Sequence, residues 1–194
     1  MIDEDLPPLD ASFGERFARE RRPACQLYLI SPPVIDGAFT DRLARAVGAG
    51  PVAAFQLRLK GIDEHSIAAL AEPLQRVCAD HDVAFIVNDS IGLAKRLGAD
   101  GVHLGQSDGD PRDARQILGK EAQIGVTCHD SRHLAMEAGE AGVDYVAFGA
   151  IGGITPGNAP PLVAAGADFI AVCNAVWGGD EEAAVKAFDK VLTV

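Results

Sequence analysis

Two cations stand close together in the segment Gln56-Leu57-Arg58-Leu59-Lys60, where polar and apolar residues alternate strictly. In a β-strand this alternation points Gln56, Arg58 and Lys60 to one face. The preceding Ala53-Ala54-Phe55 is apolar and indicates a buried strand, from which two inward cations are costly unless an anion meets them. An arginine beside a lysine suits a diphosphate. The alternative interpretation is an edge strand with a solvated polar face.

Two carboxylates could complete an anion site. Asn88-Asp89 follows the apolar run Ala84–Val87, and Asp108 comes three residues after the run Gly101–Gly105. Taken singly, each aspartate has a structural explanation, Asp89 as a helix cap and Asp108 as the start of a turn. Taken together at adjacent strand ends, they suit Mg²⁺, which prefers hard oxygen ligands and often bridges carboxylates to substrate phosphates.

Later apolar runs carry further candidates near their ends, and these are Thr127, Gly152, Gly153, Cys173 and Asn174. Glycine lets an anion approach backbone N–H groups closely, and late strands of (β/α)8 barrels commonly bind phosphate in this way. The alternative interpretation of the glycines is a tight turn between a strand and a helix.

The histidines and the absence of nucleophile motifs give less indication of function than the residues above. His129 and His133 are four residues apart, but no third soft ligand accompanies them, which argues against zinc. His103 stands in the middle of an apolar run and is interpreted as a core or site-lining residue. The sequence has no GxSxG, Walker or GxGxxG motif, so nucleophilic hydrolysis and P-loop chemistry lack support.

The elements that must position these residues follow from hydrophobic patterning. Seven short apolar runs predict strands: Gln26–Ser31, Ala53–Lys60, Ala84–Asp89, Gly101–Gly105, Gln123–Cys128, Tyr145–Ala150 and Phe169–Val176. Amphipathic stretches between them predict helices, including Ser66–His81, Ile91–Leu97, Pro111–Leu118, Ser131–Ala141, Gly157–Ala165 and Glu181–Leu192. Buried strands alternating with helices indicate a parallel sheet, and their number favours a closed (β/α)8 TIM barrel.

An internal repeat points to a gap in this barrel. Glycine, a small or branched residue, aspartate and a buried strand recur from Gly98, Gly142 and Gly166. The first two copies enclose a complete strand–helix unit, whereas the last two are only about half as far apart. The strand Tyr145–Ala150 runs straight into Ile151–Ile154, although parallel neighbours need a connection of about a dozen residues. We therefore expect a segment to be missing at the Ala150–Ile151 junction. If this segment is a loop that is merely mobile, activity should survive, whereas a true deletion would open the barrel and severely reduce activity.

Composition bounds the class of protein. The chain has 194 residues, 48% of them hydrophobic, and a net charge of −11. This predicts one barrel domain, 25–194, preceded by an extension, 1–24, whose acidic start is unlike a signal peptide. With no apolar run long enough to span a membrane, we expect a soluble, cytoplasmic protein without membrane or nucleic-acid partners. The cysteines form no CxxC pair and are interpreted as reduced core residues: Cys25, Cys78, Cys128 and Cys173.

Six segments together resemble the thiamine phosphate synthase (thiamine-phosphate pyrophosphorylase) family from about residue 26 to 192. They are Leu27-Tyr28-Leu29-Ile30, Gln56-Leu57-Arg58-Leu59-Lys60, Asn88-Asp89, Gly98-Ala99-Asp100-Gly101-Val102-His103-Leu104-Gly105-Gln106, Ile124-Gly125-Val126-Thr127-Cys128-His129 and Ile151-Gly152-Gly153-Ile154-Thr155.

The resemblance implies a TIM barrel enzyme with two small-molecule substrates. It would join hydroxymethylpyrimidine diphosphate to a thiazole phosphate, releasing diphosphate. By matching motif, Gln56, Arg58, Lys60, Asn88 and Thr127 would bind the pyrimidine diphosphate, with Arg58, Lys60 and Thr127 catalytic; Asp89 and Asp108 would hold Mg²⁺; Gly153, Cys173 and Asn174 would bind the thiazole phosphate.

Three departures from the family pattern stand out. Leu59 occupies a position that is usually acidic, and Ser31-Pro32-Pro33 replaces an acidic end of the first strand. The family's threonine- and lysine-containing loop after the strand Tyr145–Ala150 is absent, at the same junction where the repeat spacing indicates a gap.

Two other functions stay open. Thiazole tautomerase relatives share the fold and use a histidine where His129 stands, but they usually lack the basic strand and Asn88-Asp89. A non-catalytic barrel that binds a thiamine precursor is the second. A homo-oligomer is possible through Phe13, Phe17 and Trp177, although scattered aromatics are also ordinary packing.

Overall fold

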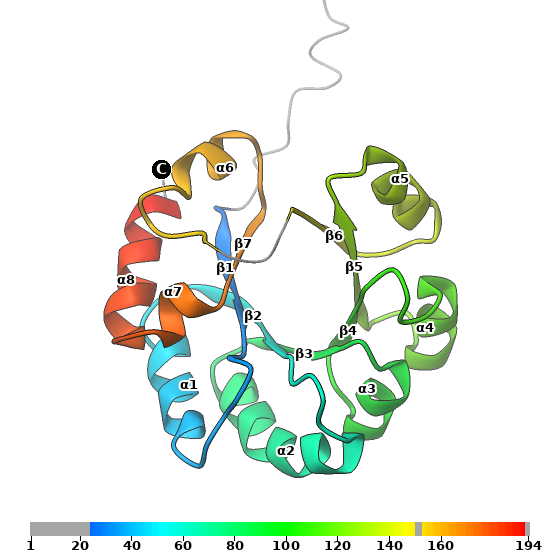
Figure 1. Ribbon diagram of the computed structural model, residues 1–194, viewed down its shortest axis with the longest axis horizontal. Coiled ribbons are helices and arrows are strands. Elements are labelled where there is room, and N and C mark those ends of the chain that lie inside the picture. Colours follow the sequence, from blue (N-terminus) through cyan, green and yellow to red (C-terminus); the bar gives the residue numbers. More distant parts are fainter. Residues whose placement is uncertain (1–23, 150–152, 193–194) are drawn as a thin grey trace, which may run out of the picture.

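The structure is a computed structural model that describes residues 24–149 and 153–192, with helices arranged outside a curled ring of strands (Figure 1). Its elements are β1 (Gln26–Ile30), α1 (Phe39–Val47), β2 (Val52–Leu57), α2 (Glu64–Asp80), β3 (Ala84–Asn88), α3 (Ile91–Leu97), β4 (Gly101–Leu104), α4 (Pro111–Leu118), β5 (Gln123–His129), α5 (Arg132–Glu140), β6 (Tyr145–Phe148), α6 (Pro160–Ala164), β7 (Phe169–Val172), α7 (Asn174–Trp177) and α8 (Glu181–Leu192).

The sheet is parallel and has the strand order β6-β5-β4-β3-β2-β1-β7. This confirms the predicted parallel α/β architecture with a TIM-barrel-like curl. The sequence also predicts eight strands and closure, whereas the described residues form seven strands whose edges, β6 and β7, do not pair with each other. Figure 1 shows α5 and α6 on the two sides of this opening. The Ala150–Ile151 junction lies outside the described residues.

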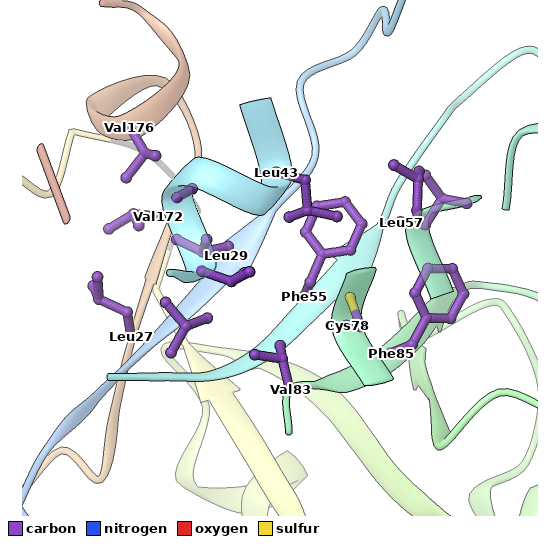
Figure 2. Packing of buried hydrophobic residues seen from close by; sticks show 14 of the residues in the cluster. Leu27, Leu29, Leu43, Phe55, Leu57, Cys78, Val83, Phe85, Val172 and Val176 are labelled. Atoms are coloured by element: carbon purple, nitrogen blue, oxygen red, sulfur yellow. The ribbon is translucent and has the colours of Figure 1, made fainter. Parts of the chain in front are cut away.

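Apolar residues on both faces of the strands explain why the runs lack polar alternation. Leu27 and Leu29 of β1 face the helices and pack with Phe55, Leu43 of α1 and Cys78 of α2 (Figure 2). The alternate residues of β1, Tyr28 and Ile30, join a smaller cluster with Ala54 and Ile86. Because successive strand side chains point to opposite faces, this second cluster fills the inside of the ring.

The repeated glycine and aspartate are structural. Gly98 and Gly142 follow helices with left-handed φ angles of 61° and 76°, which glycine adopts without strain. The carboxylate of Asp100 accepts a hydrogen bond from the backbone N–H of Phe85 at 2.7 Å, and that of Asp144 accepts one from Ile124 at 2.7 Å. Each aspartate thereby ties the start of its strand to the preceding strand and sets the register.

The last predicted strand is too long. β7 ends at Val172, and α7 begins at Asn174, within the run Phe169–Val176. A short apolar run does not distinguish a strand from a buried helical turn, and here Trp177 must turn inward to donate from Nε1 to the carbonyl of Ile30 at 2.6 Å. Trp177 is buried, so its assignment to a dimer patch is wrong. Phe13 and Phe17 lie outside the described residues.

All four thiols are free, as predicted for reduced cysteines, and Cys25, Cys78 and Cys128 are buried in the core. Cys173 is only partly buried, so the core interpretation does not extend to it. Within the described residues, no helix is both long and apolar enough to cross a membrane. The predicted extension, 1–24, lies outside the described residues except for its last position.

Candidate active site

The basic segment belongs to a central strand. β2 pairs with β1 and β3, so the edge-strand interpretation is wrong. β2 ends at Leu57, three residues earlier than predicted, but Leu57 and Leu59 stay in the core while Arg58 is half-buried and Lys60 exposed. The alternation of buried and more exposed side chains therefore continues past the end of the strand. Both cations lie at the carboxyl end of the sheet.

Arg58 is held through its backbone by a residue that the sequence marked only as a departure. The buried hydroxyl of Ser31, just after β1, accepts a hydrogen bond from the Arg58 N–H at 2.8 Å and donates to the Arg58 carbonyl at 3.2 Å. The Ser31 N–H also donates to the Gln56 carbonyl at 2.9 Å. These bonds extend the β1–β2 pairing beyond the end of β2. They fix the position of the Arg58 backbone, from which the side chain extends.

Gln56 and Asn88 meet across β2 and β3. The Gln56 amide, which is buried, donates from Nε2 to Oδ1 of Asn88 at 2.6 Å. Two residues that the sequence placed in one substrate site are thus in direct contact, and each keeps further amide groups for a ligand.

Asp89 does not cap the helix that follows it, so that explanation is wrong. Ser90 is the cap of α3, accepting a hydrogen bond from the Leu93 N–H at 3.1 Å. Asp89 instead adopts a left-handed φ of 66°, a conformation uncommon for residues other than glycine and often found at functional sites. Its carboxylate lies 3.7 Å from Nζ of Lys60.

Asp108 lies close enough to Asp89 to change its acidity. Burial raises the pKa of Asp89, the neighbouring Asp108 raises it further, and Lys60 and Arg58 oppose both effects. Asp108 also closes the turn after β4, accepting from the Gly105 N–H at 2.9 Å. We call Arg58, Lys60, Asp89 and Asp108 the mouth cluster.

The mouth cluster has the donor set of a magnesium site. Burial and the neighbouring Asp108 raise the pKa of Asp89, and a bound cation would offset this. Hard carboxylate oxygens suit Mg²⁺, whose other ligands are usually water and phosphate. Among the described residues no group of three or more histidine, cysteine or acidic side chains could hold a metal alone. His133, one of the two histidines at which the sequence argues against zinc, lies 3.4 Å from Glu137.

Thr127 belongs to a hydrogen-bonded chain inside the ring, which we call the interior chain. Its Oγ1 lies 2.8 Å from Nε2 of His103, Nδ1 of His103 lies 3.2 Å from the Tyr145 hydroxyl, and that hydroxyl lies 2.9 Å from the Tyr28 hydroxyl. Burial, with a smaller contribution from Arg58, lowers the pKa of His103 to about 4, so the ring is neutral near pH 7. Sequence reasoning missed Tyr28 and Tyr145 as site residues, since each reads as a strand aromatic.

The late strands bring the remaining candidates to the same end of the sheet. Cys173 follows β7 and Asn174 begins α7. Burial raises the pKa of the Cys173 thiol and Arg58 lowers it, so the guanidinium lies within electrostatic range of this strand end. Gly153 has a φ of 75° and open space where a side chain would stand, whereas Gly152 lies outside the described residues.

The mouth cluster lies apart from two hollows of the described residues. Two hollows, of about 350 and 590 Å³, occur in the described residues, one between α4 and α5 and the other near Asp82 and Asp100 at the opposite end of the strands. Neither is lined by the mouth cluster.

Comparison with known proteins identifies relatives. The family model for thiamine monophosphate synthase matches residues 27–151. The chain is 60% identical to a thiamine-phosphate synthase of Erythrobacter litoralis, covering 84% of this chain and 93% of the relative, and 47% identical to one of Rhodospirillum centenum, covering 87% and 98%. The fold is similar to that of the thiamine phosphate pyrophosphorylase of Pyrococcus furiosus, with a TM-score of 0.77 at 25% identity over 86% of this chain and 95% of that one.

These comparisons also reveal an internal difference in length. The alignment with the Erythrobacter relative extends over 198 residues, more than the 194 of this chain, although only 84% of this chain takes part. The relative therefore contains residues that have no counterpart here. The match to the family model ends at residue 151, three residues after the end of β6 in the sequence.

Proposed function

Because the chain belongs to the thiamine monophosphate synthase family, we propose that the carboxyl end of its sheet is where a pyrimidine diphosphate and a thiazole phosphate are joined. The family's enzymes are transferases of thiamine biosynthesis, and this chain is one of them. The observation that carries the site assignment is the convergence of two cations and two carboxylates, all from residues that follow adjacent strands β2, β3 and β4.

The cations of the mouth cluster stabilise the leaving group. Breaking the bond between the pyrimidine methylene carbon and diphosphate oxygen builds negative charge on diphosphate, which Arg58 and Lys60 meet with positive charge. Thr127 adds a hydroxyl contact to the same group. Gln56 and Asn88, already paired with each other, present their remaining amide groups to the pyrimidine diphosphate.

Asp89 and Asp108 would hold Mg²⁺ in this scheme. The chemistry that the ion supplies when bound is neutralisation of charge on the diphosphate. Without it, the two carboxylates oppose the approach of an anionic substrate, and a bound cation would offset this repulsion.

No protein nucleophile is needed. The electron-rich pyrimidine can carry the positive charge that remains when diphosphate leaves, and the thiazole nitrogen then forms the new carbon–nitrogen bond. The backbone groups at Gly153, Cys173 and Asn174 would bind the thiazole phosphate and position that nitrogen. The protein contributes positioning, charge stabilisation and exclusion of water.

We also propose that the barrel, residues 25–194, lacks one strand–helix unit of its family at the Ala150–Ile151 junction. Three observations support this: the short repeat spacing, the longer alignment of the relatives, and a sheet that is open between β6 and β7. The family's lysine-containing loop falls in the same place, at the carboxyl end of β6.

Diphosphate release by the expressed protein tests the assignment. Pyrimidine diphosphate, thiazole phosphate and Mg²⁺ are supplied together and each is omitted in turn, while intact mass establishes the length of the chain in the same sample. Release that depends on both substrates is the expected result. Binding of thiazole phosphate without release would instead favour the tautomerase-like or the non-catalytic alternative.

A further inference from the structure

The interior chain crosses the inside of the ring from β1 to β5. It links Tyr28, Tyr145, His103 and Thr127 by three successive hydrogen bonds of 2.9, 3.2 and 2.8 Å. Tyr28 and His103 are buried, and Tyr145 and Thr127 are partly exposed. Thr127 stands near the end of β5, so the interior chain connects the buried inside of the ring to the carboxyl end of the sheet.

Gly125 makes this connection possible. It lies beside both His103 and Tyr145 in the sheet register, and a side-chain carbon at Gly125 would stand 2.0 Å from the Tyr145 ring. Without a side chain there, the Tyr145 ring extends over the backbone of β5 and reaches the imidazole, with ring centroids 5.6 Å apart. The glycine is therefore a requirement of the interior chain.

Counting protons favours one direction for the hydrogen bonds. An order in which Tyr28 and Nδ1–H of His103 both donate to Tyr145 leaves the Tyr145 hydroxyl proton without a partner among the described residues. A neutral imidazole donates from one nitrogen and accepts at the other, and each hydroxyl carries one proton. If Thr127 donated to His103, the order would run inward and end on Tyr28, whose hydroxyl has no partner but Tyr145 among the described residues and is packed against Ile30, Ala54 and Ile86. That order leaves a buried donor unpaired, which is unfavourable.

The outward order leaves no buried donor unpaired. Tyr28 donates to Tyr145, Tyr145 donates to Nδ1 of His103, and the protonated Nε2 donates to Thr127. The Thr127 hydroxyl then has its own proton free, at the end of the chain that borders the mouth cluster.

We propose that the interior chain holds His103 as the Nε2–H tautomer and thereby makes the Thr127 hydroxyl a dedicated donor to an oxyanion. This rests on the proposed function, in which Thr127 faces diphosphate. His103 and Tyr145 then act as positioning residues, because they determine that Thr127 offers a proton and not a lone pair.

The tautomer is measured directly by nuclear magnetic resonance of the full chain labelled with ¹⁵N-histidine. The expected spectrum assigns the proton of His103 to Nε2. Protonation at Nδ1 overturns the proposal whether or not the protein is active.

Calorimetric titration with Mg²⁺ and inorganic diphosphate tests the consequence. We expect Thr127→Val to weaken diphosphate binding roughly tenfold to a hundredfold, the range for a hydrogen bond to a charged group, and Thr127→Ser to retain it. Tyr145→Phe should weaken binding by about threefold to tenfold and leave His103 in a mixture of tautomers. Tyr28→Phe removes the same kind of hydroxyl one step further away and should have the smaller effect, since Tyr145 can still donate to Nδ1.

A double variant distinguishes a relay from separate structural effects. In a Thr127→Val background, Tyr145→Phe should weaken diphosphate binding no further, because the hydroxyl that it positions is already gone. Additive losses overturn the relay. Failure of the unaltered protein to bind diphosphate would overturn the diphosphate site itself, an outcome that the tautomer measurement separates from failure of the relay.

Discussion

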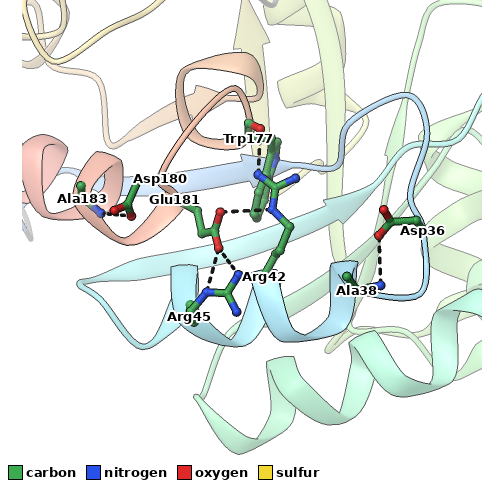
Figure 3. Close-up of polar contacts among 8 residues, drawn as sticks. All are labelled: Asp36, Ala38, Arg42, Arg45, Trp177, Asp180, Glu181 and Ala183. Carbon is green, nitrogen blue, oxygen red and sulfur yellow. Dashed lines mark hydrogen bonds and ion pairs between the residues drawn. The ribbon is translucent and has the colours of Figure 1, made fainter.

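Two charged clusters of this molecule differ in how fully their charged side chains are paired with one another. In the helix layer, the buried Glu181 at the start of α8 receives hydrogen bonds from Arg42 at 3.1 Å and from Arg45 at 2.9 and 2.5 Å (Figure 3). Arg42 also donates to the Trp177 carbonyl at 2.8 Å. The mouth cluster, by contrast, contains one ion pair, Lys60 with Asp89 at 3.7 Å.

The acidity of the two clusters shows the same difference. Although burial alone raises the pKa of Glu181, hydrogen bonds from Arg45 and Arg42 bring it below its ordinary value. Burial and Asp108 raise the pKa of Asp89 in spite of Lys60 and Arg58. A cluster whose charges satisfy one another stabilises the fold, whereas a cluster that holds like charges together is arranged for a ligand.

Chelation of Mg²⁺ should have the largest effect on turnover, and we expect it to affect the mouth cluster and not the helix layer. We expect EDTA to reduce diphosphate release to background and Mg²⁺ to restore it, while the unfolding midpoint changes little. Release that is indifferent to chelation would remove Asp89 and Asp108 from the metal assignment.

Arg58→Ala should lower turnover by a hundredfold or more, the loss expected for one group that stabilises transition-state charge. Steady-state diphosphate release measures it. Arg112→Ala is the matched control, because Arg112 is exposed on α4 and forms a surface ion pair with Asp110 at 3.8 Å. Equal rates for the two variants would contradict the assignment of Arg58 to the ligand, because Arg112 is an ordinary surface cation.

Asp89→Asn should lower turnover by about a hundredfold and raise the Mg²⁺ concentration needed for half-maximal rate. It also removes a like-charge contact with Asp108, so thermal unfolding should occur at the same temperature or slightly higher. A large drop in unfolding temperature would show that Asp89 is structural.

Glu181→Gln should lower stability and leave turnover unchanged, the opposite of Asp89→Asn. Removing one partner of a buried ion pair is strongly destabilising, but Arg42 and Arg45 are 30% and 53% exposed and can be solvated, so we expect a loss of about 1–2 kcal/mol in the free energy of unfolding. Urea denaturation measures the loss. Turnover per folded molecule should stay unchanged, and a catalytic defect would contradict the comparison.

The smallest effect is the pH dependence of that stabilisation. Because the pKa of Glu181 is lower in the folded state, its contribution is complete above the unfolded value, about 4.3, and disappears as the pH falls through the folded value. The difference in unfolding free energy between wild type and Glu181→Gln should therefore be constant from pH 6 to 7 and shrink below about pH 4. A difference that persists in acid would assign it to packing.

Much of the site was predictable because it follows strand ends. Parallel strands present their carboxyl ends at one edge, so Arg58, Asp89 and Asp108 could be grouped from the position of each after an apolar run. The same logic could not distinguish a functional aspartate from a cap: Asp89 and Ser90 both fit the capping position, and only the hydrogen bond from Leu93 to Ser90 resolves it.

The sequence by itself determined the strand–helix alternation, the free cysteines, the strand-end candidates and the family, because these depend on local periodicity and on residues close in the chain. Only the tertiary structure decided that Glu181 closes on α1, that Ser31 holds the backbone of Arg58, and that Tyr28 meets Tyr145. Each of these contacts joins segments far apart in the sequence, and a hydrogen bond leaves no periodic signal in the chain. Which polar residues satisfy one another, and which are left for a ligand, is therefore a property of the folded molecule.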